Sequence, residues 1–286
     1  MNPGLDTIKA YYDDRIDGKI LDFVQANPRV EGALKTLVEW APRSARRILE
    51  IGCGVGATTW RMSRIWPEAE VIGMDLSPRS LAVARKCFQN SNLSYREGRL
   101  AEGFLPGQFD YIVLMDVYEH IARPERPTFR AALKSLLAEN GRIFLSFPTP
   151  LHLADLRIHA PKEIQPVDED VTPECILHLA GTVTREILFY KVVGIWRYGD
   201  YAHAVIGRIP NLDPVMPRNP RSGALQFVRT TVKRLIRPRR ASLEPVTNLL
   251  GPDEAAPGSS LARRIPALSR SVREQLVAAW RSQPKG

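Results

Sequence analysis

Short apolar runs alternate with amphipathic stretches along the first two hundred residues, as in proteins whose strands and helices follow one another. The apolar runs predict strands at Arg47–Ile51, Glu70–Met74, Leu93–Arg96, Tyr111–Met115, Arg142–Phe147, Ile187–Trp196 and Ala202–Ile209. The amphipathic stretches predict helices at Ala57–Ile65, Pro78–Phe88 and Pro127–Ala138. Such alternation produces a parallel sheet that is covered on both faces. We therefore expect an α/β fold with a doubly wound, mostly parallel, seven-stranded sheet.

Turn and capping residues refine this picture. A hydroxyl residue precedes a proline at Ser77-Pro78, Thr149-Pro150 and Thr172-Pro173, which predicts a capped helix start at each place. Few residues separate the last two strands, so they should form a C-terminal antiparallel hairpin. Residues 148–172 are too long for an ordinary connection, and we expect them to form a cap insertion.

Charge divides the chain of 286 residues, whose formal net charge is +9. Residues 208–286 hold 15 basic and 5 acidic residues and 10 of the 23 prolines, whereas the preceding part is almost neutral. We therefore expect an N-terminal helical lid at 1–45, a globular domain at 46–209, and a basic, proline-rich, helical or irregular extension at 210–286. With 44% apolar residues the chain is too apolar to be wholly disordered.

The cysteines and the extension bear on location and partners. Cys53, Cys87 and Cys175 lie far apart without metal-type spacing, which indicates reduced thiols and a cytoplasmic protein. Apolar and basic positions alternate at helical spacing over residues 226–240. Such a helix can lie on an anionic membrane surface, hold a protein partner, bind nucleic acid, or pack on the parent domain. The oligomeric state is left open.

A glycine-rich turn follows the first predicted strand. Gly52 and Gly54 allow a ligand to approach the backbone closely, and the following helix offers free amides. The turn also fits a loose dinucleotide fingerprint, so a nicotinamide-dependent oxidoreductase is an alternative. Glu50 would repel a pyrophosphate but suits a ligand with an ammonium and a sulfonium. Asp75, after the second strand, can accept ribose hydroxyls. Asp75 fits either cofactor, whereas Glu50 favours the methyl donor S-adenosylmethionine.

With these residues the chain resembles the class I S-adenosylmethionine-dependent methyltransferases from about Arg46 to Arg208. The likeness extends to Phe109–Ile121, similar to the family's fourth-strand motif, and to Ala138–Leu145, similar to its next turn and strand. It implies the Rossmann-like methyltransferase fold. By position it also implies a donor site formed by Glu50, Gly52, Cys53, Gly54, Asp75, Leu76, Leu100 and Asp116.

Two features around this site differ from the family or resemble it more loosely. Arg99 stands where the family often has an acidic residue for the adenine amine, so backbone carbonyls or Glu102 are the alternatives. Tyr11 and Tyr12 resemble the lid that many members close over the donor. An ordinary helix that packs by its aromatic residues is the other interpretation.

Methyl transfer to oxygen needs a base, and histidine is the usual choice. His120 follows the fourth strand, His152 lies in the expected cap, and His203 follows the hairpin turn, so all three are candidates. His152, Asp155 and His159 would share one helical face, either as a base with its carboxylate or as a polar surface.

The acidic run Asp168-Glu169-Asp170 precedes a predicted helix. It could bind Mg²⁺, but such runs more often complement a helix N-terminus, so no metal ligand is assigned.

The acceptor is suggested by a looser resemblance. Residues 163–169 and 199–203 look like those of sugar or polysaccharide-cluster methyltransferases, which implies a hydroxyl of a sugar, glycan or related natural product. A nucleic-acid methyltransferase is the rival hypothesis because of the basic extension. Enzymes of that kind that act on base amino groups usually carry an Asn/Asp-Pro-Pro-aromatic motif, and this chain has Asp116-Val117-Tyr118-Glu119 there.

Overall fold

The computed structural model describes residues 4–42, 44–101 and 105–208. The predicted extension at 210–286, with its 226–240 segment, lies outside the described residues, as does Glu102. The helices are α1 (Leu5–Asp13), α2 (Ile16–Val24), α3 (Pro28–Trp40), α4 (Ala57–Ile65), α5 (Pro78–Cys87), α6 (Arg126–Leu136), α7 (Pro150–His159) and α8 (Pro173–Thr182). The strands are β1 (Arg47–Ile51), β2 (Glu70–Asp75), β3 (Leu93–Glu97), β4 (Phe109–Met115), β5 (Leu137–Pro148), β6 (Glu186–Val193) and β7 (Tyr201–Gly207). Three short 3-10 turns are η1 (Tyr118–His120), η2 (Arg123–Glu125) and η3 (Pro161–Glu163).

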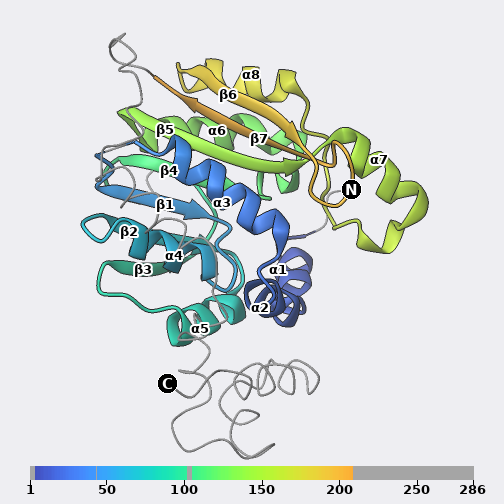
Figure 1. Cartoon of the computed structure of the whole chain (residues 1–286), viewed down its shortest axis with the longest axis horizontal. Coiled ribbons are helices and arrows are strands. Elements are labelled where there is room, and N and C mark those ends of the chain that lie inside the picture. The colour runs from blue at the N-terminus through green and yellow to red at the C-terminus, as the bar shows by residue number, and fades with distance from the viewer. Residues whose placement is uncertain (1–3, 43, 102–104, 209–286) are drawn as a thin grey trace, which may run out of the picture.

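These strands form one seven-stranded sheet in the order β3-β2-β1-β4-β5-β7-β6 (Figure 1). The neighbours from β3 to β5 pair in parallel, and β7 runs antiparallel to both β5 and β6. The predicted doubly wound, mostly parallel sheet with its C-terminal hairpin is confirmed. Since β6 therefore runs in the same direction as β5, the hairpin turn lies at the carboxyl edge of the parallel strands.

Three local predictions needed correction. The strand expected at Ile187–Trp196 ends at Val193, before the hairpin turn. The helix expected to end at Ala138 ends at Leu136, and the next strand begins at Leu137 instead of Arg142. The reason is that Leu137 pairs with Phe109 ahead of an irregularity in the β4–β5 register. Ser77 and Thr149 cap their helices through side-chain oxygens, whereas Thr172 makes no side-chain cap bond.

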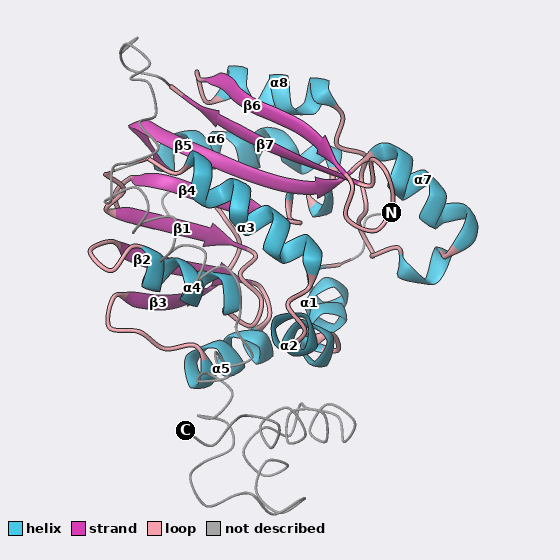
Figure 2. Ribbon diagram, viewed as in Figure 1, coloured by secondary structure: helices cyan, strands magenta, loops and turns pink. Residues whose placement is uncertain are grey.

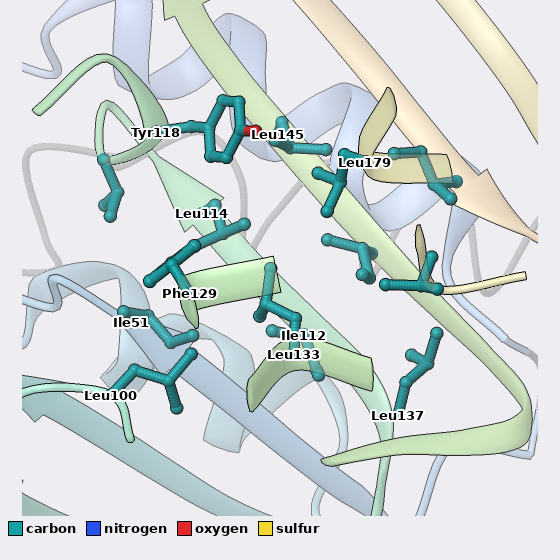
Figure 3. Packing of buried hydrophobic residues seen from close by; sticks show 14 of the residues in the cluster. Ile51, Leu100, Ile112, Leu114, Tyr118, Phe129, Leu133, Leu137, Leu145 and Leu179 are labelled. Atoms are coloured by element: carbon teal, nitrogen blue, oxygen red, sulfur yellow. The ribbon is translucent and has the colours of Figure 1, made fainter. Parts of the chain in front are cut away.

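Helices cover both faces of the sheet (Figure 2). Successive strand residues point to opposite faces, so Ile112 packs in a cluster with α6 and α8, and Val113 packs in a cluster with α3 and α4. Figure 3 shows the first cluster, in which Phe129 and Leu133 of α6 lie against β4. The inner strands β1, β2, β4 and β7 are largely buried on both faces, which explains their apolar sequences, whereas the edge strands β3 and β6 are only partly buried.

The N-terminal helices are anchored by aromatic packing. Phe23 of α2 meets Trp60 of α4 and Phe88 after α5, with the Phe23 and Phe88 ring centroids 5.1 Å apart. This contact sets α1 and α2 at the carboxyl edge of the sheet, where α7 also projects (Figure 1). Among the described residues, no helix is both long and apolar enough to cross a membrane.

Candidate active site

A tight turn follows β1 at the carboxyl edge. Gly52 and Gly54 have φ of 72° and 53°, a backbone region that glycine adopts without strain. At Gly52 a Cβ atom would lie 2.6 Å from Val117 Cγ2, so the turn also needs the missing side chain. The amide of Gly54 donates a 2.7 Å hydrogen bond to Asp75 Oδ2, which ties the turn to the end of β2.

A cavity of about 450 Å³ opens over this turn. Its wall comes from the glycine turn, the ends of β2 and β4, the N-terminal helices, the cap and the hairpin turn. All the residues that the sequence assigned to the donor site line it: Glu50, Gly52, Cys53, Gly54, Asp75, Leu76, Leu100 and Asp116. The turn, the carboxylates and the β4 motif thus share one cavity, as the parallel topology requires.

Glu50 lies at the floor of the cavity and is 3% exposed. The hydroxyl of Thr59 donates a short hydrogen bond to its carboxyl group. The pKa of Glu50 is raised to about 8, chiefly by burial and also by Asp75, against the lowering effects of Thr59 and Lys19. A carboxyl group that is costly to ionise beside an open cavity is suited to a cationic ligand, which would restore its charge.

Asp75 is fixed at both oxygens. Its Oδ2 accepts from Gly54, and its Oδ1 accepts from the amide of Ser77 at 2.8 Å. Burial nevertheless raises the pKa of this carboxyl. Each oxygen keeps a lone pair, so the rigid carboxylate can still accept hydrogen bonds from two ligand hydroxyls.

Two cations from the N-terminal helices enter the same cavity, and the sequence gave no motif for either. Lys19 of α2 lines the cavity. Arg29 of α3 forms an ion pair with Asp116. Asp116 has φ of 54°, an uncommon conformation for a non-glycine residue. The Asn27-Pro28 helix start, with Asn27 accepting from the Arg29 amide, was the available signal for this position.

His120 lies on η1 and lines the cavity. Its Nδ1 lies 2.7 Å from the carbonyl oxygen of Val167 and 3.1 Å from Asp168 Oδ1, while Nε2 lies 3.8 Å from Glu119 Oε1. Burial lowers the pKa of His120, but Glu119, Asp168 and Val167 outweigh it, so the net pKa is raised. A carbonyl oxygen can only accept, so the proton of the neutral ring lies on Nδ1.

The other candidate histidines lie in different surroundings. His152 lines the cavity, with its ring 5.9 Å from that of Tyr201. His203 does not line it: this side chain is 2% exposed under α3, and its Nδ1 lies 3.0 Å from Thr36 Oγ1. Burial and Lys191 lower the pKa of His203 to about 4, which keeps the ring neutral.

The polar face of α7 faces away from the cavity. Asp155 pairs with exposed His159, at 3.0 Å, and with Arg197. Neither Asp155 nor His159 lines the cavity. Asp155 and His159 therefore belong to a polar surface, whereas His152 of the same helix lines the cavity, so the three residues do not act as one set.

The acidic run in the cap does not converge on a common point. Asp168 faces His120, Glu169 pairs with Arg123 at 2.9 Å, and Asp170 pairs with Arg157 at 3.0 Å. Across the described residues, no three His, Cys, Asp or Glu side chains are grouped as metal ligands would be.

Aromatic side chains complete the wall. Tyr12 lines the cavity with its ring 6.3 Å from that of His120, whereas Tyr11 does not line it. On the opposite side, Trp196 and Tyr201 of the hairpin line it with ring centroids 6.0 Å apart. Trp196 remains 55% exposed, so the mouth of the cavity has an aromatic rim.

Comparison with known proteins agrees with this geometry. Residues 48–141 match the family model of a methyltransferase domain. We refer to these residues as the methyltransferase segment. It holds the glycine turn, both carboxylates and η1, the elements on which the sequence resemblance rested.

The curated relatives match over the same region. The mitochondrial ubiquinone biosynthesis O-methyltransferase of Schizosaccharomyces pombe is 35% identical over 108 residues, which is 36% of this chain and 38% of that protein. A ubiquinone biosynthesis O-methyltransferase of Cereibacter sphaeroides is 36% identical over 108 residues, 37% of this chain and 42% of the relative. The match thus spans less than half the length of these relatives.

Solved structures share the fold beyond the methyltransferase segment. Magnesium protoporphyrin IX methyltransferase from Synechocystis, solved with bound S-adenosylhomocysteine, superposes with a TM-score of 0.53 at 20% identity, covering 66% of this chain and 87% of that one. A SAM-dependent methyltransferase from Anabaena variabilis gives 0.55 at 18% identity, covering 73% and 98%. The fold is therefore the Rossmann-like methyltransferase fold, and S-adenosylmethionine is the cofactor that fits the family.

Proposed function

We propose that this chain transfers a methyl group from S-adenosylmethionine to a hydroxyl oxygen. The observation that carries the proposal is the convergence of Glu50, Asp75 and the glycine turn on one cavity within the methyltransferase segment. A nucleotide fold that served a pyrophosphate would place no buried carboxyl group beside this turn, because that charge repels phosphates.

The residues present fit the donor. Glu50 would face its cationic end, Asp75 would accept its ribose hydroxyls, and Leu76 and Leu100 would contact the adenine. Lys19 and Arg29 supply positive charge at the same cavity, as the donor's carboxylate requires. When bound, the donor supplies an electrophilic methyl group, and the protein chiefly aligns the acceptor with it.

His120 is the residue that we propose as the base. Its Nδ1 is occupied by Val167 and Asp168, so Nε2 is the nitrogen of the neutral ring that can take a proton from a hydroxyl. His152, at the cavity wall beside Tyr201, is better placed to contact the acceptor than to act as a base, because its ring nitrogens have no hydrogen-bond partner among the described residues that would orient the ring. His203 has no part in this proposal.

The chemical class of the acceptor is a more specific part of the proposal. Trp196 and Tyr201 offer aromatic faces on which a ring can stack, and both a sugar and a phenolic ring carry hydroxyls that His120 could deprotonate. The sequence resemblance favours a sugar, glycan or natural-product hydroxyl, whereas the curated relatives are named for ubiquinone biosynthesis. We therefore propose a ring-bound hydroxyl and leave the choice of ring to experiment.

Nucleic acid is the less favoured acceptor. More acidic than basic side chains line the cavity, and this charge opposes a phosphodiester backbone. The cytoplasmic location and a peripheral membrane or protein contact through 226–240 remain proposals. Removal of residues 210–286 should leave methylation of a small acceptor intact and should weaken binding to anionic vesicles or nucleic acid, whichever the extension serves.

The function is tested by calorimetry and turnover. The full chain should bind S-adenosylhomocysteine and not NAD, and should release S-adenosylhomocysteine when given S-adenosylmethionine with phenolic or sugar acceptors. His120→Gln should lower kcat by about two to four orders of magnitude while donor affinity stays unchanged. His203→Gln is the control for loss of a histidine outside the cavity. Binding of NAD alone would overturn the proposal.

A further inference from the structure

The cap is attached to η1 by contacts that converge on His120. The amide of Glu169 donates to the carbonyl oxygen of Glu119 at 2.9 Å, and Val167 and Asp168 both contact His120 Nδ1. The Asp168 side chain is 5% exposed, and its second oxygen accepts from the Gln165 amide at 2.8 Å. Asp168 is therefore held in a fixed position against the imidazole ring.

We propose that Asp168 is a positioning residue that fixes the orientation and the tautomer of His120 for proton abstraction. This inference rests on the proposed function, since it concerns the base of that reaction. Asp168 and Val167 together keep the proton on Nδ1, and Nε2 is thereby left as the basic nitrogen. A carboxylate in this place also stabilises the imidazolium that forms when the hydroxyl proton arrives.

Two further side chains lie close to the His120 ring. Glu119 of η1 approaches Nε2 at 3.8 Å, and Tyr12 of α1 presents its ring at 6.3 Å. Glu119 is 1% exposed, and neither of its carboxyl oxygens has a hydrogen-bond partner among the described residues. Glu119 and Asp168 both raise the pKa of His120. Of the two carboxyl groups, only Asp168 approaches a ring nitrogen within hydrogen-bond distance, at 3.1 Å from Nδ1.

The adjacent carboxylates of the cap provide matched controls. Glu169 and Asp170 carry the same charge one and two residues away, but they pair with Arg123 and Arg157 outside the cavity. If negative charge anywhere in the cap were sufficient, all three residues would raise the His120 pKa to a similar extent. If the contact with Nδ1 is required, only Asp168 will raise it.

The test measures His120 directly and needs no acceptor. Asp168→Asn keeps an oxygen that accepts from Nδ1 but removes the charge, so the variant should fold. In ¹³C-histidine-labelled full chain, with the His120 signal assigned from His120→Gln, this variant should lower the His120 pKa by about one pH unit or more. Glu169→Gln and Asp170→Asn should leave it nearly unchanged. Asp168→Glu should restore part of the shift.

Turnover supplies the second readout. In Asp168→Asn, kcat should fall by about tenfold or more, less than in His120→Gln, and the acid limb of its pH profile should move with the measured His120 pKa. An unchanged His120 pKa in an active enzyme would overturn the role of Asp168 alone. A lowered His120 pKa in a chain that turns over no acceptor would support the contact and refute the proposed function instead.

Discussion

Replacement of Glu50 by glutamine should make the ligand-free protein more stable and its donor binding weaker. Glutamine has nearly the shape of a protonated glutamic acid and keeps an oxygen that can accept from Thr59. It removes the one property that sets Glu50 apart, a charge that is costly at a buried position. The cavity that holds the residue is otherwise unchanged.

The magnitude follows from the shift in pKa. The pKa of Glu50 rises from 4.5 to about 8 on folding, because burial disfavours the charged form. A carboxyl group with a raised pKa binds its proton more tightly in the folded state, so the stability it contributes is full below the unfolded pKa and falls as pH rises. Relative to glutamine, Glu50 should lower the free energy of unfolding by about 1 kcal/mol at pH 5 and by about 3 kcal/mol at pH 7.

Urea unfolding at pH 5, 6, 7 and 8 measures this difference. The gap between Glu50→Gln and the parent chain should widen as pH rises and level off above pH 8. Glu68→Gln, at an exposed site on the same domain, should show no such gap. A difference that is constant over this range would refute the argument that burial sets the protonation of Glu50.

The same substitution should weaken donor binding, although it stabilises the ligand-free protein. A cationic donor should bind the ionised carboxylate, so binding should release a proton below pH 8 and should strengthen with pH up to that value. Calorimetry in buffers of different ionisation enthalpy counts that proton. Glu50→Gln should lose the proton release and about 10- to 100-fold in affinity for S-adenosylmethionine.

Two further substitutions test the turn and the buried histidine. Gly54→Ala should destabilise the chain by roughly 1–2 kcal/mol through left-handed backbone strain. Gly52→Ala should destabilise it by more, because a Cβ atom at Gly52 would meet Val117 whereas one at Gly54 has open space. Equal losses of unfolding free energy in chemical denaturation would contradict the close approach of Val117 to Gly52. His203→Gln should leave the affinity for S-adenosylhomocysteine unchanged. Because the lowered pKa of His203 makes the folded state lose stability as pH falls from about 6.5 to 4, the parent should lose about 3 kcal/mol more than this variant between pH 7 and pH 4.

The sequence predicted the sheet well because each strand carries its own signal. Strands buried on both faces are continuous apolar runs, and their ends are set by turn residues such as Gly52 and by caps such as Ser77. The errors lay where a long-range pairing decides the boundary. Leu137 reads as the end of a helix, and only its pairing with Phe109 makes it the start of β5.

The histidines illustrate the limit for single side chains. His120, His152 and His203 were equivalent candidates in the sequence because all three belong to the same edge of the sheet. His203 is excluded from the cavity by the face of β7 on which its side chain lies. This face is covered by α3, and the His203 ring contacts Thr36, which is 167 residues away in the sequence. Side-chain alternation in a strand is readable, but which face receives which helix is not.

The donor half of the cavity could be predicted from the sequence, whereas the half that would hold the acceptor could not. The donor half is one local unit, in which the glycine turn must bend sharply and Asp75 must receive the Gly54 amide, so function constrains consecutive residues and leaves a motif. The other half is assembled from three segments that meet only in the folded chain: the N-terminal helices with Tyr12, the cap with Asp168, and the hairpin with Tyr201. Contacts of this kind constrain residues one at a time and at long separation. The donor therefore follows from a motif in the sequence, whereas the residues that would orient the base and the acceptor required the structure.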